Sequence, residues 1–372
     1  MKKVILICIF ALCFSGCSLQ GEPSSVLDSQ NHFQIEEDAS LHIRMDDSAY
    51  ATAIRNLWDT TFPKHKGALS IHCDTSKDFS TYDIDYLQDT QIAKRKEKLY
   101  NIEHVQEHIE LPVEDYLQKD EDYFLPVDGR GLVFLYNEEA LIARGGNIQN
   151  MESFESMKSL GNHVYYHNRN AEYVYPFLHT EEDQEEDTWY ENLEAYRNLN
   201  KDNEFLDDQY EMSSFYMDGY ICGLVQNDGT YQLTDLYRKG KLHFKSMPTY
   251  HSQSFSPIVD TYGFVVYKTT KYPGAASAFL QLVRSESGMK LLLKHTSKTP
   301  LIAKKALEDF FVYDRSRKEL MEALNESQLR NSKILAKMKK ENFYSTIQNA
   351  MYTKESNESF IKKMKDDIES FL

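Results

Sequence analysis

The sequence predicts an α/β fold with largely parallel sheets, and two patterns carry this prediction. Short alternating or continuous apolar runs recur along the chain, and amphipathic helical segments separate them. One run, 132–136 (Leu-Val-Phe-Leu-Tyr), is apolar throughout, which is typical of a strand buried on both faces. The chain has 372 residues, of which 41 % are hydrophobic, so it can bury a large core and form two domains.

The first predicted unit is a strand over 41–45, in which apolar and polar residues alternate. Asp46, Asp47 and Ser48 follow as N-cap candidates of a helix over 49–62. Further strands are predicted over 68–73, 81–87, 163–166, 220–225 and 263–267. Helices are predicted over 275–284 and 288–294 and over most of 316–372, with breaks near Asn325, Asn349 and Ser356.

The charge balance limits the classes of partner. The chain carries 42 Lys and Arg against 58 Asp and Glu, a formal net charge of −16. This charge repels phosphate backbones and anionic lipid head groups, so non-specific binding to either is disfavoured. We therefore expect no nucleic-acid partner.

The N-terminus resembles the signal peptide of a bacterial lipoprotein. Two lysines precede an apolar run over 4–14, which is too short to span a bilayer as a helix. Ser15-Gly16-Cys17 then resembles a lipobox, which implies that residues 1–16 are removed and that Cys17 is acylated. A diacylglyceryl group brings two acyl chains, enough for stable anchoring. A plain signal peptide that happens to contain cysteines is the alternative.

Residues 17–39 are polar and show little apolar periodicity, so we expect them to form a flexible tether between membrane and fold. The predicted location is therefore extracytoplasmic, lipid-anchored to the cell membrane. In the mature chain only the thiols of Cys73 and Cys222 remain. Two cysteines in a chain of this length make no disulfide framework, and we expect both thiols to be free.

One short motif raises the possibility of a metal site. Residues 104–108 (His-Val-Gln-Glu-His) match the His-x-x-Glu-His pattern of inverted zinc peptidases, and a helix would place both histidines on one face. Pro112 ends any such helix within a turn, and no other peptidase feature accompanies the match. An exposed helical turn is the favoured interpretation, so we expect no metal, no cofactor and no enzymatic activity.

Several segments occur in an order that points to one family. Upstream, Leu-Pro-Val at 125–127 precedes Leu-Tyr-Asn-Glu-Glu-Ala-Leu at 135–141. Downstream, Met-Pro-Thr at 247–249 precedes a glycine-containing strand at 259–268, the helix from Ala275 and finally Pro300. Together these segments resemble the extracellular solute-binding proteins (family 1, sugar- and maltodextrin-like) of bacterial ABC transporters, over about residues 40–372.

The resemblance implies a two-lobed periplasmic-binding-protein-like clamp with C-terminal helices. Such a protein binds a carbohydrate or a related small solute between its lobes and delivers it to ABC permease subunits. The implied lobes are 40–128 plus 259–308 for lobe one and 129–258 plus 309–372 for lobe two. A lipid-anchored solute sensor and a surface hydrolase are the alternative functions, because a fold does not fix a function.

The resemblance also implies ligand residues. Asp46 follows the first strand, where N-capping is an equal alternative, and Asp89 follows the strand that ends at Leu87. Arg130 stands where maltodextrin binders usually carry Glu, with Asp128 two residues earlier, which allows a charged or smaller solute. The remaining implied contacts are Tyr173, Tyr175, Tyr231, Asp260 and Tyr262. For the tyrosines, a core or surface role is the alternative to stacking on a sugar ring.

Overall fold

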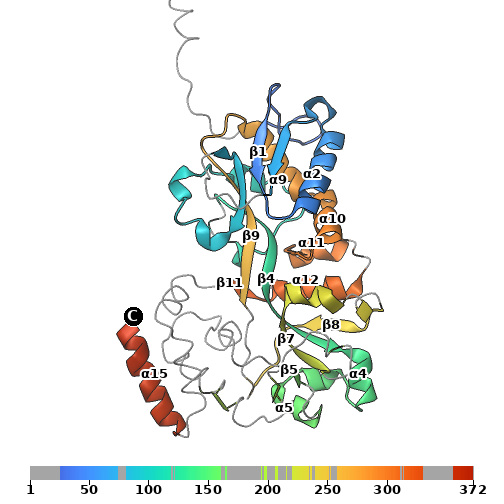
Figure 1. Cartoon of the computed structure of the whole chain (residues 1–372), viewed down its shortest axis with the longest axis vertical. Helices are drawn as coiled ribbons and strands as arrows, with labels where there is room; N and C mark the ends of the chain where they lie inside the picture. The colour runs from blue at the N-terminus through green and yellow to red at the C-terminus, as the bar shows by residue number, and fades with distance from the viewer. Residues whose placement is uncertain are drawn as a thin grey trace, which may run out of the picture.

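The computed structural model shows an α/β chain with two lobes, drawn one above the other in Figure 1. The described residues are 26–73, 81–118, 120, 122–160, 164–165, isolated positions between 194 and 215, 220–233, 235–236, 239–250, 252, 258–310, 312, 314–329 and 355–371. Cys17 and the predicted signal peptide lie outside them. Within these ranges, no helix combines the length and the apolar character needed to cross a bilayer.

Lobe one is built on three short parallel strands. They are β1 (Leu41–Arg44), β2 (Leu69–His72) and β3 (Ile84–Gln88). Helix α2 (Ser48–Thr61) packs its face carrying Tyr50, Ile54 and Trp58 into the core, as its spacing of four residues predicts. Helices α9 (Pro273–Val283), α10 (Glu286–His295) and α11 (Lys304–Asp309) belong to the same lobe, next to α2 in Figure 1.

Two long strands connect the lobes. β4 (Leu125–Asn137) and β9 (Ile258–Val266) pair antiparallel to each other and occupy the middle of the sheet. Figure 1 shows that both strands extend between the upper and the lower lobe, in opposite chain directions. β4 is much longer than the expected run over 132–136, because Pro126 and the two following glycines are strand residues instead of loop residues. A register shift between Pro126 and Asp128 accommodates the proline, which cannot donate a ladder hydrogen bond.

Lobe two continues the sheet beyond β4. Its strands are β7 (Cys222–Gln226), β5 (Val164–Tyr165), β6 (Leu206–Asp207) and β8 (Leu242–Lys245). The described helices that contribute side chains to the core of lobe two are α4 (Glu138–Ala143), α5 (Phe154–Met157), α12 (Arg315–Asn325) and α15 (Asn357–Phe371). Two short strands, β10 (Thr299–Pro300) and β11 (Gln328–Leu329), pair with β4 and β9.

The predicted α/β class is confirmed, but the sheet is mixed and not largely parallel. β9 pairs antiparallel with both β3 and β4, and β4 pairs antiparallel with β7 and β8. Most of the parallel pairs lie at the two ends of the sheet, in β2-β1-β3 and β6-β5-β7, and the short strand β11 pairs parallel with β9. The apolar run of β4 indicated burial on both faces, and burial alone does not fix the direction of the neighbouring strands.

The segment 26–39 differs from the expected flexible tether, because it packs on lobe one. Phe33 is only 1 % exposed and belongs to the lobe-one core. The Glu36 carboxylate accepts hydrogen bonds from the backbone N–H groups of Gly274 (2.8 Å) and Ala275 (2.9 Å). These are orphan donors of the first turn of α9, so a side chain from the N-terminal segment caps this helix.

Candidate functional site

The candidate site lies at the junction of the two lobes, which the two hydrophobic cores define. On β4, Leu125 and Val127 belong to the lobe-one core, whereas Leu132 and the residues after it belong to the lobe-two core. On β9, Phe264 belongs to the lobe-one core and Val259 to the lobe-two core. The residues between these positions therefore pass from one lobe to the other.

Strand register gathers four of the predicted ligand residues on one face of this junction. Asp128 pairs with Tyr262 across β4 and β9, and Arg130 pairs with Asp260. Directly paired residues share a face, and so do residues two apart on one strand. Tyr86 of β3 adds a second aromatic ring, which stacks on Tyr262 with centroids 6.2 Å apart and an interplanar angle of 21°.

A network around one ammonium group joins these residues to Asp46. The Nζ atom of Lys298 lies 2.7 Å from Asp46 Oδ2 and 2.5 Å from the Tyr86 hydroxyl oxygen. It lies 3.8 Å from Asp128 Oδ2. The Tyr86 hydroxyl in turn donates to Asp128 Oδ1. Polar side chains thereby link the segment after β1, the middle of β3, the crossing strand β4 and the segment before β10.

Burial changes the acidity of two members of this network. Burial raises the pKa of Asp128 to about 6, and the positive charge of Lys298 opposes this rise. Burial also holds the pKa of the Tyr86 hydroxyl well above its usual value, and the Asp128 carboxylate adds to that effect. Tyr86 therefore stays protonated and donates, while Asp128 can change its charge in the slightly acidic range.

Arg130 lies beside this network with part of its side chain in solvent. Its Nε atom is 3.4 Å from Asp228 Oδ2, and its guanidinium carbon lies 5.1 Å from the centroid of the Tyr262 ring. The side chain is 48 % exposed. A guanidinium group offers several donors in a fixed plane, so it can bridge neighbouring hydroxyl groups of a solute. The carboxylate of Asp228 balances the positive charge of Arg130 within the junction.

A buried amide fixes the backbone beneath these side chains. Asn227, 1 % exposed, donates from Nδ2 to Gly129 O and to Thr299 Oγ1, both at 2.9 Å, and its Oδ1 accepts from Gly131 N at 3.0 Å. A Cβ atom at Gly129 would lie 2.7 Å from Val259 Cγ2. This glycine is therefore required by close packing at the junction.

The structure gives different surroundings to the remaining predicted residues. Asp47 caps α2 by accepting from Tyr50 N at 2.8 Å, which leaves Asp46 as the member of the network. Asp89 is 1 % exposed and lies in the short helix that follows β3. The Tyr231 hydroxyl donates to Lys298 O at 3.1 Å, and the Arg317 guanidinium lies 5.0 Å from the centroid of its ring. Tyr173 and Tyr175 lie outside the described residues.

The His-x-x-Glu-His motif belongs to the packing of lobe one. Its helix, α3 (Glu103–Gln106), is a single turn. The His104 and His108 rings both meet the Phe33 ring edge-on, with centroids 5.6 and 5.7 Å apart, and His104 Nε2 lies 3.1 Å from Ser277 Oγ. Across the described part of the chain, no group of three His, Cys, Asp or Glu side chains is arranged to hold a metal ion.

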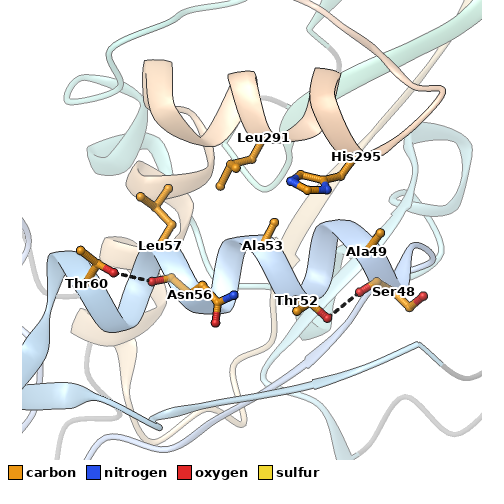
Figure 2. A pocket seen from close by; sticks show the side chains of 9 residues that line it. All are labelled: Ser48, Ala49, Thr52, Ala53, Asn56, Leu57, Thr60, Leu291 and His295. Carbon is orange, nitrogen blue, oxygen red and sulfur yellow. Dashed lines mark hydrogen bonds between the residues drawn. The ribbon is translucent and has the colours of Figure 1, made fainter.

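A surface groove on lobe one has a different character. Figure 2 shows it between α2 and α10, and its volume is about 710 Å³. It is lined by Ser48, Ala49, Thr52, Ala53, Asn56, Leu57, Thr60, Leu291 and His295. The hydroxyl groups of Thr52 and Thr60 donate hydrogen bonds to backbone carbonyls one turn earlier in α2, so few polar groups of the groove remain for a ligand.

Four junction residues were not singled out from the sequence. Tyr86 lies inside a predicted strand, Lys298 in the segment after a helix, and Asn227 and Asp228 after another predicted strand. The last two closely follow the strand predicted over 220–225, but nothing in the sequence distinguished them from their neighbours. Nothing local marks Lys298, because its partners come from strands that are more than 150 positions away in the sequence.

Comparisons with known proteins match the fold and not the sequence. No protein-family model matches the chain, and no curated protein sequence matches it. The solved structure of the maltodextrin-binding protein of L. casei BL23 without ligand matches with a TM-score of 0.66 and 13 % identity, over 90 % of this chain and 98 % of that one. The extracellular solute-binding protein of Staphylococcus aureus in complex with maltose matches with a TM-score of 0.67 and 12 % identity, over 90 % and 98 %.

A third structure agrees with these two. The cyclic alpha-maltosyl-1,6-maltose binding protein of Arthrobacter globiformis matches with a TM-score of 0.66 and 13 % identity, over 90 % of this chain and 99 % of that one. The matches span nearly the full length of each protein. The chain therefore has the two-lobed fold of periplasmic binding proteins.

Proposed function

We propose that this protein is the solute-binding component of an ABC importer and binds a carbohydrate or related small solute between its two lobes. The observation that carries the proposal is the junction network of Asp46, Tyr86, Asp128 and Lys298. It joins the segment after β1 and the middle of β3, both in lobe one, to the strand that crosses into lobe two. Its polar groups lie where a solute held between the lobes would meet them.

The chemistry of the junction suits a polyhydroxylated solute. Half-exposed Asp46 accepts hydrogen bonds, Arg130 donates them, and the Tyr86 and Tyr262 rings supply faces for the C–H surface of a sugar. The junction holds four carboxylates (Asp46, Asp128, Asp228 and Asp260) and two cations (Arg130 and Lys298), so an anionic solute would face a site without surplus positive charge. This argument favours uncharged sugars and polyols over sugar phosphates.

The anchor and the transport partner belong to the same proposal. Acylated Cys17 would hold the protein at the outer face of the cell membrane, and ABC permease subunits would receive the solute. The packing of 26–39 on lobe one supports a membrane connection through that lobe, with lobe two moving on closure. No catalytic step is included, since binding and release suffice for the proposed role.

A binding screen tests the proposal. Thermal denaturation is followed with maltose, maltotriose, maltotetraose, polyols and sugar phosphates, since a ligand of the native state raises Tm with concentration by mass action. We expect stabilisation by an uncharged member of the set. A screen in which no sugar or polyol raises Tm, with calorimetry also showing no heat of binding, would contradict the proposed function.

Arg130→Ala is the informative variant for a solute found in this way. Removing a charged hydrogen-bond donor costs about 1.5–3 kcal/mol, so calorimetry should show an affinity about ten- to a hundredfold weaker. Lys239→Ala, at an exposed position of lobe two, is the matched control and should bind like the wild type. Equal affinities in Arg130→Ala and the wild type would remove Arg130 from the site.

A further inference from the structure

Lys298 is the point at which the junction network converges. Its side chain is only 10 % exposed, and one Nζ atom contacts oxygens supplied by three separate strands or strand ends. The same ammonium lies 4.1 Å from the centroid of the Tyr86 ring. A buried ammonium with this many partners holds a defined position, because moving away from them would leave a positive charge unpaired and shielded from water.

Each hydrogen bond in the network has a defined donor and acceptor. The Tyr86 hydroxyl donates a hydrogen bond to Asp128, and its oxygen accepts one from Lys298. Lys298 also donates to Asp46 Oδ2, while the Asp46 side chain stays 50 % exposed. Asp46 is thus turned toward Lys298 on one side and open to solvent on the other. A solute hydroxyl can donate to this carboxylate without displacing the ammonium.

We propose that Lys298 is a positioning residue of the solute site, which holds Asp46 and Tyr86 in their binding orientation while Asp128 is ionised. The inference rests on the proposed function, since it concerns the same site. When Asp128 is protonated, the ammonium keeps its ion pair with Asp46 but loses its attraction to the carboxylate 3.8 Å away on β4. The Asp46–Lys298 pair is then no longer held electrostatically to the crossing strand, so the position of Asp46 relative to that strand is less fixed.

The surroundings of Asp128 support a change of charge under mild conditions. The charged or titratable groups around it are Asp46, Tyr50, Tyr86, Arg130, Tyr231, Tyr262 and Lys298. Burial raises its pKa to about 6, Asp46 adds to the rise, and the two cations oppose it. One pH unit below that value only about a tenth of the molecules carry ionised Asp128. Solute affinity should therefore fall about tenfold between pH 7.5 and pH 5.

The test combines a ligand-free and a ligand-bound measurement on the full-length mature protein. In the first, NMR of ring-labelled tyrosine follows Tyr86, assigned with Tyr86→Phe, between pH 5 and pH 8 without any solute. We expect the Tyr86 resonance to titrate near pH 6 in the wild type, at higher pH in Lys298→Met, and not at all in Asp128→Asn. A Tyr86 resonance that does not move in the wild type would overturn the inference.

In the second measurement, calorimetry with maltose or maltotriose gives affinities at pH 5 and pH 7.5. Lys298→Met should bind at least tenfold more weakly at pH 7.5, Lys298→Arg should recover part of this loss, and Lys294→Met, at an exposed position of α10, should match the wild type. Equal affinity in Lys298→Met, or a pH response that persists in Asp128→Asn, would overturn the inference but leave the function standing. Absence of any sugar binding would overturn the proposed function. The NMR titration would still test whether Tyr86, Asp128 and Lys298 are coupled, because it needs no solute.

Discussion

At the scale of single residues, the burial of Asp128 has a measurable consequence for stability. It is buried on the crossing strand, and its folded-state pKa of about 6 lies above the value of about 3.9 usual for an unfolded aspartate. Between these two values the folded state binds more protons than the unfolded state. The free energy of unfolding must therefore fall as the pH rises through this window.

The size of the effect follows from the difference between the two pKa values. Ionising Asp128 should destabilise the fold by about 3 kcal/mol, a penalty absent below about pH 4 and complete above about pH 6. Urea unfolding of the wild type and Asp128→Asn from pH 4 to pH 7.5 isolates this contribution, since other groups titrate in both proteins. The wild type should lose more stability than the variant over this range. Parallel pH curves would show that Asp128 does not titrate as described.

Sequence reasoning at this scale reached some site residues and missed others for identifiable reasons. Asp128, Arg130, Asp260 and Tyr262 were proposed from the family resemblance, and strand register brings them to one face. Lys298 was missed because its importance comes only from its distant partners. Asp46 and Asp47 could not be separated from sequence, because both follow the strand. The structure separates them by giving the cap to Asp47 and the ion pair to Asp46.

At the scale of elements, the N-terminal segment behaves as part of lobe one. Phe33 fills a site between the two histidines of α3 and its loop, and Glu36 caps α9. This packing could not be predicted from the sequence, because one aromatic residue in a polar segment has no periodicity. The His-x-x-Glu-His motif likewise acquires its packing role from Phe33, 71 positions before His104, which a motif search cannot see.

Phe33→Ala tests this packing. Removing a fully buried phenylalanine side chain should lower the free energy of unfolding by about 3 kcal/mol and expose 26–39 to proteolysis. Val26→Ala, at a position that is 52 % exposed, is the control and should leave both properties unchanged. Chemical denaturation and limited proteolysis with mass spectrometry measure the two effects. If Phe33→Ala is as stable and as resistant as Val26→Ala, the segment is a tether as first expected.

The long strands show where element prediction from sequence stops. The strand predicted from the apolar run 132–136 is the lobe-two half of β4, and the strand predicted from the pattern over 263–267 is the lobe-one half of β9. For β9, only the family resemblance extended the strand back to residue 259. The other halves contain Pro126, Gly129 and Asp260, which are poor strand formers on their own. Pairing with each other makes them strands, so the antiparallel connection between the lobes is visible only in three dimensions.

At the scale of the whole molecule, the account describes two lobes that share one sheet and meet at a polar junction. Each lobe has its own core, and the lobes are joined by β4, β9 and the segment around β10. Because the lobes are joined by only these segments among the described residues, one lobe can move relative to the other about the shared strands. A solute that contacts both lobes favours the closed arrangement, because the open one offers fewer contacts.

Small-angle X-ray scattering tests this central claim most directly. The mature protein is measured alone and saturated with the sugar identified in the thermal screen, with Arg130→Ala at the same sugar concentration as the weakly binding control. The account predicts that the radius of gyration falls on saturation of the wild type and falls less in the control. A radius of gyration that is unchanged when calorimetry shows full occupancy would contradict closure of two lobes around a solute.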